Sequence, residues 1–358
     1  MNATAGRTTA FDLAGRLRAG ATVQAGWMGI GDPIFAEIVA RSGFDAIVLD
    51  MQHGMFGPAS LAGSIGAAAG AGKPVAVRVP VGDMAMASRA LDMGAAAVIA
   101  PMIDTVEQAR AFVDAMKFAP LGRRSWGPGR AMMLSGESVA QRYLTTANRD
   151  TLALAMIETR EGLDAVEDIL AVPGIDGVFV GPNDLSIALS GGDRVDPHST
   201  LVDLALTRIV EAAKGAGKIA GIFGGAPERV KIVRQFGFTF VSIGHDTAYV
   251  KAGIEAMIAA GWVEEVRTLL ERGYGPDIER LKALGFREIA AVVRGEQELE
   301  VAVAAVKMHH RRYAKRQLTW FRNDARVAWL DVEETVSPEA LAERIVRDAF
   351  APGTRKSI

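Results

Sequence analysis

The stretches LALAMIETREG (residues 152–162) and GVFVGPNDLS (residues 177–186) decide the fold that this sequence predicts. In each, a short apolar run is followed directly by polar residues. An uninterrupted apolar run of this length is typical of a strand buried on both faces, as in a parallel sheet. Glu158 and Asp184 stand where the two runs end, so we expect both carboxylates at the mouth of the sheet. Two acids placed there could share one divalent cation through oxygen ligands, which indicates a metal-assisted enzyme.

Similar strand patterns recur along residues 1–257 and alternate with alanine-rich helical stretches such as Ile34–Ser42, Ser60–Ala71, Met84–Met93 and Val106–Lys117. This alternation predicts an α/β fold, a TIM (β/α)8 barrel, whose catalytic residues lie at the carboxyl ends of the strands. The rival is an open, doubly wound sheet, which the lack of G-x-G-x-x-G after the first strand disfavours. The predicted strands are Gln24–Gly29, Asp45–Met51, Pro74–Val79, Ala96–Met102, Leu152–Glu158, Gly177–Gly181, Ile219–Phe223 and Phe240–Gly244.

Composition narrows the class of protein. The 358 residues suffice for a barrel and an appendage, and 49% hydrophobic against 23% charged residues predicts a packed core. A net charge of −2 gives no reason to expect the whole molecule to bind nucleic acid or membranes. With no cysteine, disulfides, thiolate nucleophiles and cysteine-bound zinc are excluded. The N-terminus lacks the pattern of a secretory signal and no apolar run is long enough to span a bilayer, so we expect a cytoplasmic protein.

The character of the sequence changes beyond Gly244. Charged residues become dense and the pattern is helical, apart from a short strand-like run at Arg326–Leu330. We therefore expect a domain boundary near Ala260, with the barrel at residues 1–257 and a mainly helical appendage at 258–358. Within KMHHRRYAKR (residues 307–316), seven of ten residues are basic or histidine. Such a segment is either a solvated helix face or a contact to nucleic acid.

Two further strand ends carry polar side chains toward the same mouth. Asp50 and His53 lie in IVLDMQHGMFGP (residues 47–58), and Arg78 lies in VAVRVP (residues 75–80). A histidine in a loop after a barrel strand can act as a general base near neutral pH; the alternative is a loop histidine with no role. An arginine that closes an apolar strand is costly to bury without an anion. That anion is either a substrate or a structural partner such as Asp50 or Asp83.

Three other features have open interpretations. From its spacing alone, Asp92 in RALDMGA is a polar residue near the end of a helix. The segment FAPLGRRSWGPGRAMM (residues 118–133), rich in Gly, Pro and Arg, suits a lid or substrate-facing loop. Alternatively, its arginines form surface or subunit pairs. His245, after the eighth strand, is interpreted as a residue near the mouth that takes no direct part in the reaction.

Several kinds of site are excluded by missing motifs. The sequence contains no G-x-x-x-x-G-K-[ST], no G-x-S-x-G and no H-E-x-x-H. No predicted barrel strand ends in a lysine, which argues against an aldolase that forms a covalent imine.

Taken together, DMQHG, RVP, ALDMGA, the arginine-rich loop, MIETREG and GVFVGPNDLS occur in an order that resembles the metal-dependent, pyruvate-specific aldolases of the 4-hydroxy-2-oxoheptanedioate aldolase family. That family includes enzymes acting on 2-keto-3-deoxy sugar acids, and the resemblance covers roughly residues 10–257. It implies a TIM barrel, a homo-oligomer, and a divalent ion held by Glu158 and Asp184. Mg²⁺ is the expected ion, with Mn²⁺ or Co²⁺ as alternatives.

The resemblance also implies roles for individual residues. His53 is expected to accept a proton, Arg78 to stabilise an enolate and Asp92 to raise the basicity of His53. Gln52, Met156 and Asn183 depart from the family's pattern, which leaves the substrate specificity open. The expected catalytic residues are thus His53, Arg78, Asp92 and Asp50, and the expected substrate-binding residues are Met156, Asn183, Asp184 and Trp27.

The predicted reaction is that of a carbon–carbon lyase. A 4-hydroxy-2-oxo acid would bind the cation through its carboxylate and its C2 carbonyl oxygen. His53 would take the proton of the C4 hydroxyl, and the C3–C4 bond would break to release an aldehyde and the enolate of pyruvate. Backbone N–H groups of Asn183 and Asp184 are expected to bind the carboxylate.

The tail resembles a different enzyme. GWVEEVRTLLERG, LKALGFREI and RRYAKRQLTWFRND look like the C-terminal part of bacterial tRNA dimethylallyltransferases, over about residues 256–335. Because the P-loop that such enzymes need is missing, prenyl transfer is not expected. The alternative function is RNA binding or tRNA modification, with weak tRNA binding through residues 307–316. A noncatalytic barrel scaffold is the third hypothesis.

Overall fold

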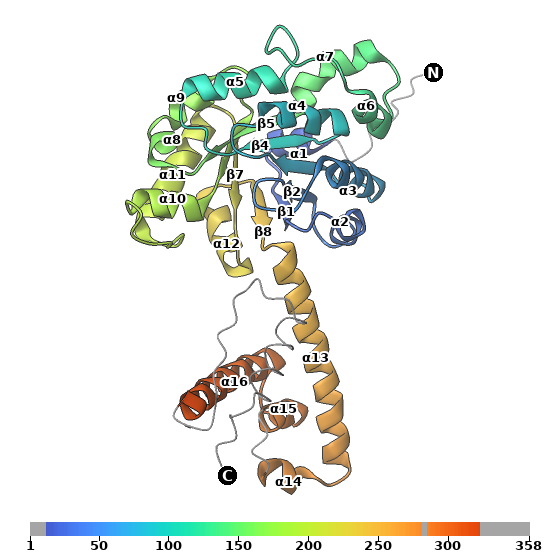
Figure 1. Ribbon diagram of the computed structural model, residues 1–358, viewed down its shortest axis with the longest axis vertical. Helices are drawn as coiled ribbons and strands as arrows, with labels where there is room; N and C mark the ends of the chain where they lie inside the picture. Colours follow the sequence, from blue (N-terminus) through green and yellow to red (C-terminus); the bar gives the residue numbers. More distant parts are fainter. Residues whose placement is uncertain (1–11, 281–284, 323–358) are drawn as a thin grey trace, which may run out of the picture. The chain divides into compact units, whose positions relative to one another are not determined.

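The protein divides into two compact units, residues 1–253 and 254–358, with the division inside one long helix. The structure, a computed structural model, describes residues 12–280 and 285–322 (Figure 1). The predicted strand at 326–330 lies outside the described residues.

The first unit is a closed barrel of eight parallel strands in chain order, in which β1 also pairs with β8 (Figure 1). The TIM barrel predicted from the sequence is confirmed. Strand ends differ from the predicted ones by at most two residues; β4, for example, stops at Ala100 because Pro101 has no N–H for the ladder. The strands are β1 Val23–Met28, β2 Ala46–Asp50, β3 Val75–Arg78, β4 Ala97–Ala100, β5 Leu152–Ile157, β6 Gly177–Val180, β7 Ile219–Phe223 and β8 Phe240–Ile243.

Helices follow the strands and cover the outside of the barrel. Helix α2 begins at Pro33 because the Asp32 side chain accepts a hydrogen bond from Phe35 N at 2.9 Å. Helix α4 ends at Gly94, whose φ of 110° gives the left-handed cap. The helices of this unit are α1 Leu13–Arg18, α2 Pro33–Ala40, α3 Pro58–Gly70, α4 Met84–Met93, α5 Val106–Met116, α6 Gly129–Ser135, α7 Ala140–Asp150, α8 Arg160–Asp164, α9 Val166–Ala171, α10 Pro182–Leu189, α11 Thr200–Gly215, α12 Pro227–Phe236 and the first part of α13 Asp246–Glu271.

A buried lysine ties the amino-terminal end of the barrel together. Lys117 is fully buried, and its Nζ donates to the carbonyl oxygens of Asn148 and Thr151 and, at 2.6 Å, to Asp176 Oδ2. Burial lowers the pKa of the Lys117 ammonium, which the neighbouring Asp176 carboxylate opposes. Since Thr151 precedes β5 and Asp176 precedes β6, this cation links the starts of two strands.

The second unit is helical. The rest of α13 packs with α14 Gly275–Arg280, α15 Phe286–Val293 and α16 Leu299–Arg322 around a small apolar core. A Cβ on Gly285 would lie 2.0 Å from the Trp262 ring, so a glycine with a φ of 98° is required there. In the basic segment 307–316, Lys307 forms an ion pair with Glu255, and His309 Nδ1 lies 2.7 Å from Glu288 Oε1. The core residues are Val266, Ile278, Ile289, Ala290 and Ala302.

None of the helices within the described ranges is long and apolar enough to cross a membrane.

Candidate active site

Strand alternation aims four side chains into the mouth of the barrel. Along a strand every second side chain faces the barrel interior, and the polar or aromatic residue at the carboxyl end continues that inward row. Trp27 continues the row of β1, Asp50 that of β2, Arg78 that of β3 and Glu158 that of β5. The buried inward residues beneath them are Val23 and Ala25, Ala46 and Val48, Ala76, and Leu152, Leu154 and Met156.

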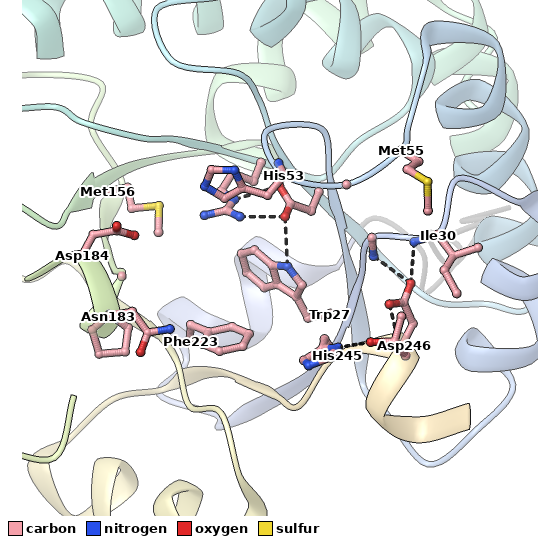
Figure 2. A pocket seen from close by; sticks show the side chains of 17 residues that line it. Trp27, Ile30, His53, Met55, Met156, Asn183, Asp184, Phe223, His245 and Asp246 are labelled. Carbon is pink, nitrogen blue, oxygen red and sulfur yellow. Dashed lines mark hydrogen bonds and ion pairs between the residues drawn. The ribbon is translucent and has the colours of Figure 1, made fainter. Parts of the chain in front are cut away.

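A cavity of about 420 Å³ opens at these strand ends, a size typical of small-molecule sites (Figure 2). Seven of the nine residues predicted to form the site line this cavity. Glu158 is buried beside it, and Asp92 is not among its lining residues. The predicted residues along its wall are Trp27, Asp50, His53, Arg78, Met156, Asn183 and Asp184.

Arg78 and Asp50 form a buried ion pair on one wall. Arg78 Nε donates to Asp50 Oδ1 at 2.8 Å and Arg78 Nη2 donates to Asp50 Oδ2 at 2.6 Å. The guanidinium also lies 4.9 Å from the centre of the Trp27 ring, whose Nε1 donates to Asp50 Oδ2 at 3.3 Å. The structural pair foreseen for Arg78 is therefore present. It also holds the guanidinium in the cavity wall, because both partners are more than nine-tenths buried.

Glu158 is a buried carboxylate with one unused oxygen. Its Oε1 accepts a hydrogen bond from Met102 N at 2.9 Å, and Met102 has a φ of 55°, which is unusual for a residue other than glycine. Oε2 is buried and has no hydrogen-bond partner among the described residues. Burial, together with the charges of Asp184 and Asp104, raises the pKa of Glu158 to about 7.

The end of β6 brings a second acid to Glu158. Asp184 lies in the first turn of α10, which begins at Pro182 directly after β6. A Cβ on Gly181 would lie 2.6 Å from Glu158 Oε2 and 2.7 Å from Met156 Cε, so only glycine lets β6 pass so close. The amino-terminal turn of α10 has no side-chain cap, which leaves backbone N–H groups facing the cavity end of the helix.

These two acids fit a divalent cation. No group of three or more His, Asp or Glu side chains that could enclose an ion occurs within residues 12–280 and 285–322. Mg²⁺ is commonly held by one or two carboxylates, with water or substrate oxygens completing its shell. An unpartnered carboxylate oxygen in Glu158, beside Asp184, matches that arrangement.

His53 and Asp92 are not brought together within one chain. His53 lies in the loop after β2, and its backbone N lies 3.4 Å from Asp50 Oδ1. Asp92 lies near the end of α4, at the opposite end of the barrel, and accepts a hydrogen bond from Arg124 Nη2 at 2.6 Å. The role implied for Asp92 stays a prediction.

The arginine-rich loop does not cover the cavity of its own chain. Residues 118–128 follow α5, so they lie at the amino-terminal end of the barrel, and none of them lines the cavity. The expected lid is therefore not formed by this loop, part of which is helix α6. Its arginines form pairs instead, which was the alternative interpretation: Arg124 binds Asp92, and Arg130 donates to the carbonyl oxygen of Ala62.

Sequence reasoning missed two contributors to the site. Asp246, at the start of α13, is buried and accepts hydrogen bonds from Gly29 N at 2.7 Å and Ile30 N at 2.6 Å. It thereby fixes the loop after β1 to the loop after β8. Phe223, at the end of β7, packs edge-on against Trp27 with 5.2 Å between ring centres. Both residues end predicted strands or follow them, and that position was the available sequence signal.

Comparison with known proteins places this site in a family. The family described as HpcH/HpaI aldolase/citrate lyase matches residues 26–252, which include every strand end described above. The chain belongs to the HpcH/HpaI aldolase/citrate lyase family. It is therefore a carbon–carbon lyase, and the resemblance noted in the sequence is confirmed.

Named relatives are aldolases. A hydroxypyruvate/pyruvate aldolase of Rhizorhabdus wittichii is 38% identical over 240 residues, which is 66% of this chain and 92% of that protein. A 2-keto-3-deoxy-L-rhamnonate aldolase of Klebsiella pneumoniae is 32% identical, over 65% of this chain and 86% of that one. A crystal structure of a family member from Burkholderia cenocepacia has a TM-score of 0.63 and 30% identity, covering 72% of this chain and 99% of that chain.

The tail has a match of its own. The family described as IPP transferase matches residues 231–324, which supports the resemblance to tRNA dimethylallyltransferases over this part of the chain. Residues 231–252 fall within both matches.

Proposed function

We propose that the protein is a metal-dependent aldolase that interconverts 4-hydroxy-2-oxo acids with pyruvate and an aldehyde. The observation that carries this proposal is the unused, buried carboxylate oxygen of Glu158 beside Asp184, at the carboxyl end of a barrel of the HpcH/HpaI aldolase/citrate lyase family. Glu158 and Asp184 would hold the ion, and Mg²⁺ suits their hard oxygen ligands best. When bound, such an ion supplies Lewis-acid polarisation of the substrate's C2 carbonyl.

The protein's own groups would bind and orient the 2-oxo acid. The backbone N–H groups at the start of α10, including those of Asn183 and Asp184, are suited to the carboxylate because helix amino termini favour anions. The Arg78 guanidinium, fixed by Asp50, supplies positive charge where the C2 oxygen gains negative charge. Trp27 and Met156 provide apolar walls beside the reacting carbons.

We assign the proton transfer to His53. It lines the cavity (Figure 2), as Arg78 does, and its backbone N–H donates to the Asp50 carboxylate. In cleavage, the His53 imidazole would take the proton of the C4 hydroxyl while the C3–C4 bond breaks. In synthesis, it would return that proton to the alkoxide of the new C4 carbon.

Replacing His53 tests this assignment. For His53→Ala we expect kcat for cleavage of a 2-keto-3-deoxy acid to fall about 10²- to 10⁴-fold, the range for losing a general base. Pyruvate release coupled to lactate dehydrogenase measures it. His198→Ala, at an exposed histidine outside this cavity, is the matched control. Undiminished cleavage by His53→Ala would remove His53 from the mechanism.

A further inference from the structure

The cavity has a second polar side, away from Glu158 and Asp184. In Figure 2 the rings of Trp27 and Phe223 lie between Asp184 on one side and His245 on the other. If pyruvate binds beside Glu158 and Asp184, as proposed above, the volume of about 420 Å³ leaves room for the aldehyde portion toward His245. A role for this polar side in binding the aldehyde therefore rests on the proposed function.

The hydroxyl group of Thr247 orients the His245 ring on this side of the cavity. His245 Nδ1 and Thr247 Oγ1 are 2.6 Å apart, and both residues line the cavity. The hydrogen bond fixes the ring orientation and engages Nδ1, which leaves Nε2 available to a ligand. His245 is exposed, so its imidazole is accessible to a ligand.

The loop that carries His245 is held rigidly. The Asp246 carboxylate accepts two hydrogen bonds from the backbone after β1, and Gly244 N donates to the carbonyl oxygen of Gly225 at 2.7 Å. Gly244 has a φ of 59°, and a Cβ there would lie 2.8 Å from the Tyr249 ring. A polar group on a fixed loop is suited to specificity, because little ordering is needed on binding.

The charges of the cavity narrow the class of aldehyde. Of the described residues that line it, Arg78 is the single Lys or Arg, and Asp50 already pairs with it. Within one chain, a distal carboxylate, as in a semialdehyde, would therefore meet no free guanidinium or ammonium group among the lining residues. A hydroxyl could exchange hydrogen bonds with the His245 imidazole without needing a counter-charge.

We infer that His245, oriented by Thr247, is a specificity-determining residue that binds a hydroxyl of an uncharged, hydroxylated aldehyde. This assigns His245 a direct contact with substrate, in place of the bystander role expected from the sequence. Binding of the pyruvate portion, through its carboxylate, its C2 carbonyl and its C3 carbon, would not depend on His245.

A matched pair of aldehydes tests the inference. Wild type, His245→Ala, Thr247→Val and Thr247→Ser are assayed in the Mg²⁺-loaded full chain for addition of pyruvate to glyceraldehyde and to propanal, two three-carbon aldehydes that differ in hydroxyls. Succinic semialdehyde serves as the carboxylate probe. Decarboxylation of oxaloacetate reports on the enolate site without any aldehyde, and His198→Ala is the control substitution.

For His245→Ala the preference for glyceraldehyde over propanal, as a ratio of kcat/KM, is expected to fall roughly 3- to 10-fold, the value of one hydrogen bond. Thr247→Val should lower the ratio in the same direction and Thr247→Ser should restore it, while oxaloacetate decarboxylation stays at the wild-type rate. Wild type should also use glyceraldehyde better than succinic semialdehyde.

An unchanged glyceraldehyde-to-propanal ratio in His245→Ala, or an equal loss for both aldehydes, would overturn the inference while leaving the aldolase intact. Preference of the wild type for succinic semialdehyde would overturn the assigned substrate class. A wild type with neither aldol addition nor oxaloacetate decarboxylation would refute the proposed function and, with it, this inference.

Discussion

Glu158 shows how one position on a strand sets the chemistry of a side chain. The inward row of β5 buries Leu152, Leu154 and Met156, and the next inward position is a carboxylate with one unused oxygen. Burial raises its pKa to about 7, so below neutrality this acid binds a proton unless a cation replaces it.

This pKa predicts opposite pH dependences for the metal-free and metal-bound protein. The folded-state pKa exceeds the ordinary value of a glutamate, so between about pH 4.5 and 7 the folded protein holds a proton that the unfolded chain has lost. The free energy of unfolding of the metal-free protein should therefore fall as pH rises through this window. Glu158 accounts for at most about 3 kcal/mol of that fall. Stabilisation by added Mg²⁺ should instead grow from pH 6 to pH 8.

Thermal unfolding with and without Mg²⁺ at both pH values measures these two effects. Glu158→Gln should abolish the stabilisation by Mg²⁺ and this part of the pH dependence. Glu161→Gln, at an exposed glutamate three residues further on, should change neither. If Mg²⁺ stabilised Glu158→Gln as much as wild type, Glu158 would not be a ligand.

At the scale of elements, the parallel strands were predictable because each is a short, fully buried apolar run with polar residues after it. That same rule placed Asp50, Arg78, Glu158 and Asp184 at one end of the barrel. It could not place Asp92, whose helix carries it to the other end, or the loop 118–133. The helices before them decide this instead, because a helix that follows a barrel strand returns the chain to the amino-terminal end of the barrel. Asp246 was missed because its partners are backbone N–H groups from the far end of the sequence.

The lysine between β5 and β6 should matter for stability and not for catalysis. In Lys117→Met the carbonyl oxygens of Asn148 and Thr151 lose their buried donor, and Asp176 loses one cation while keeping Arg18. We expect the free energy of unfolding to fall by about 3 kcal/mol, as when one partner of a buried pair is removed.

Urea denaturation measures this loss, with Lys214→Met at an exposed lysine as the control. KM for pyruvate should not change, because the site is at the other end of the strands. A loss below about 0.5 kcal/mol, typical of surface positions, would contradict the structural role of Lys117.

At the scale of the whole molecule, the two family matches overlap over residues 231–252, just before the division between the units. The aldolase match ends at 252, the units divide after Gly253, and the IPP transferase match runs to 324. Every residue that lines the candidate site lies between Trp27 and Thr247. The chain therefore combines a closed eight-stranded aldolase barrel with a segment that matches a second enzyme family.

At this scale we predict that copies of the chain associate into a homo-oligomer. Ile34 and Ile38, one turn apart on α2, are 71% and 57% exposed, which is typical of a surface covered by a partner. Only a second copy could bring Asp92 to His53. Sedimentation velocity should show an oligomer, and co-expressed His53→Ala and Asp92→Asn chains should recover activity that each lacks alone. A monomer, or two inactive variants that stay inactive together, would contradict this prediction.

The most direct test of the account is metal-dependent pyruvate release. The full chain is treated with EDTA, assayed with a panel of 4-hydroxy-2-oxo acids, and assayed again after Mg²⁺ is restored. We predict pyruvate release that EDTA abolishes, that Mg²⁺ restores in wild type, and that Mg²⁺ does not restore in Glu158→Gln. Pyruvate release that survives EDTA treatment, or that is as fast in Glu158→Gln as in wild type, would contradict the account.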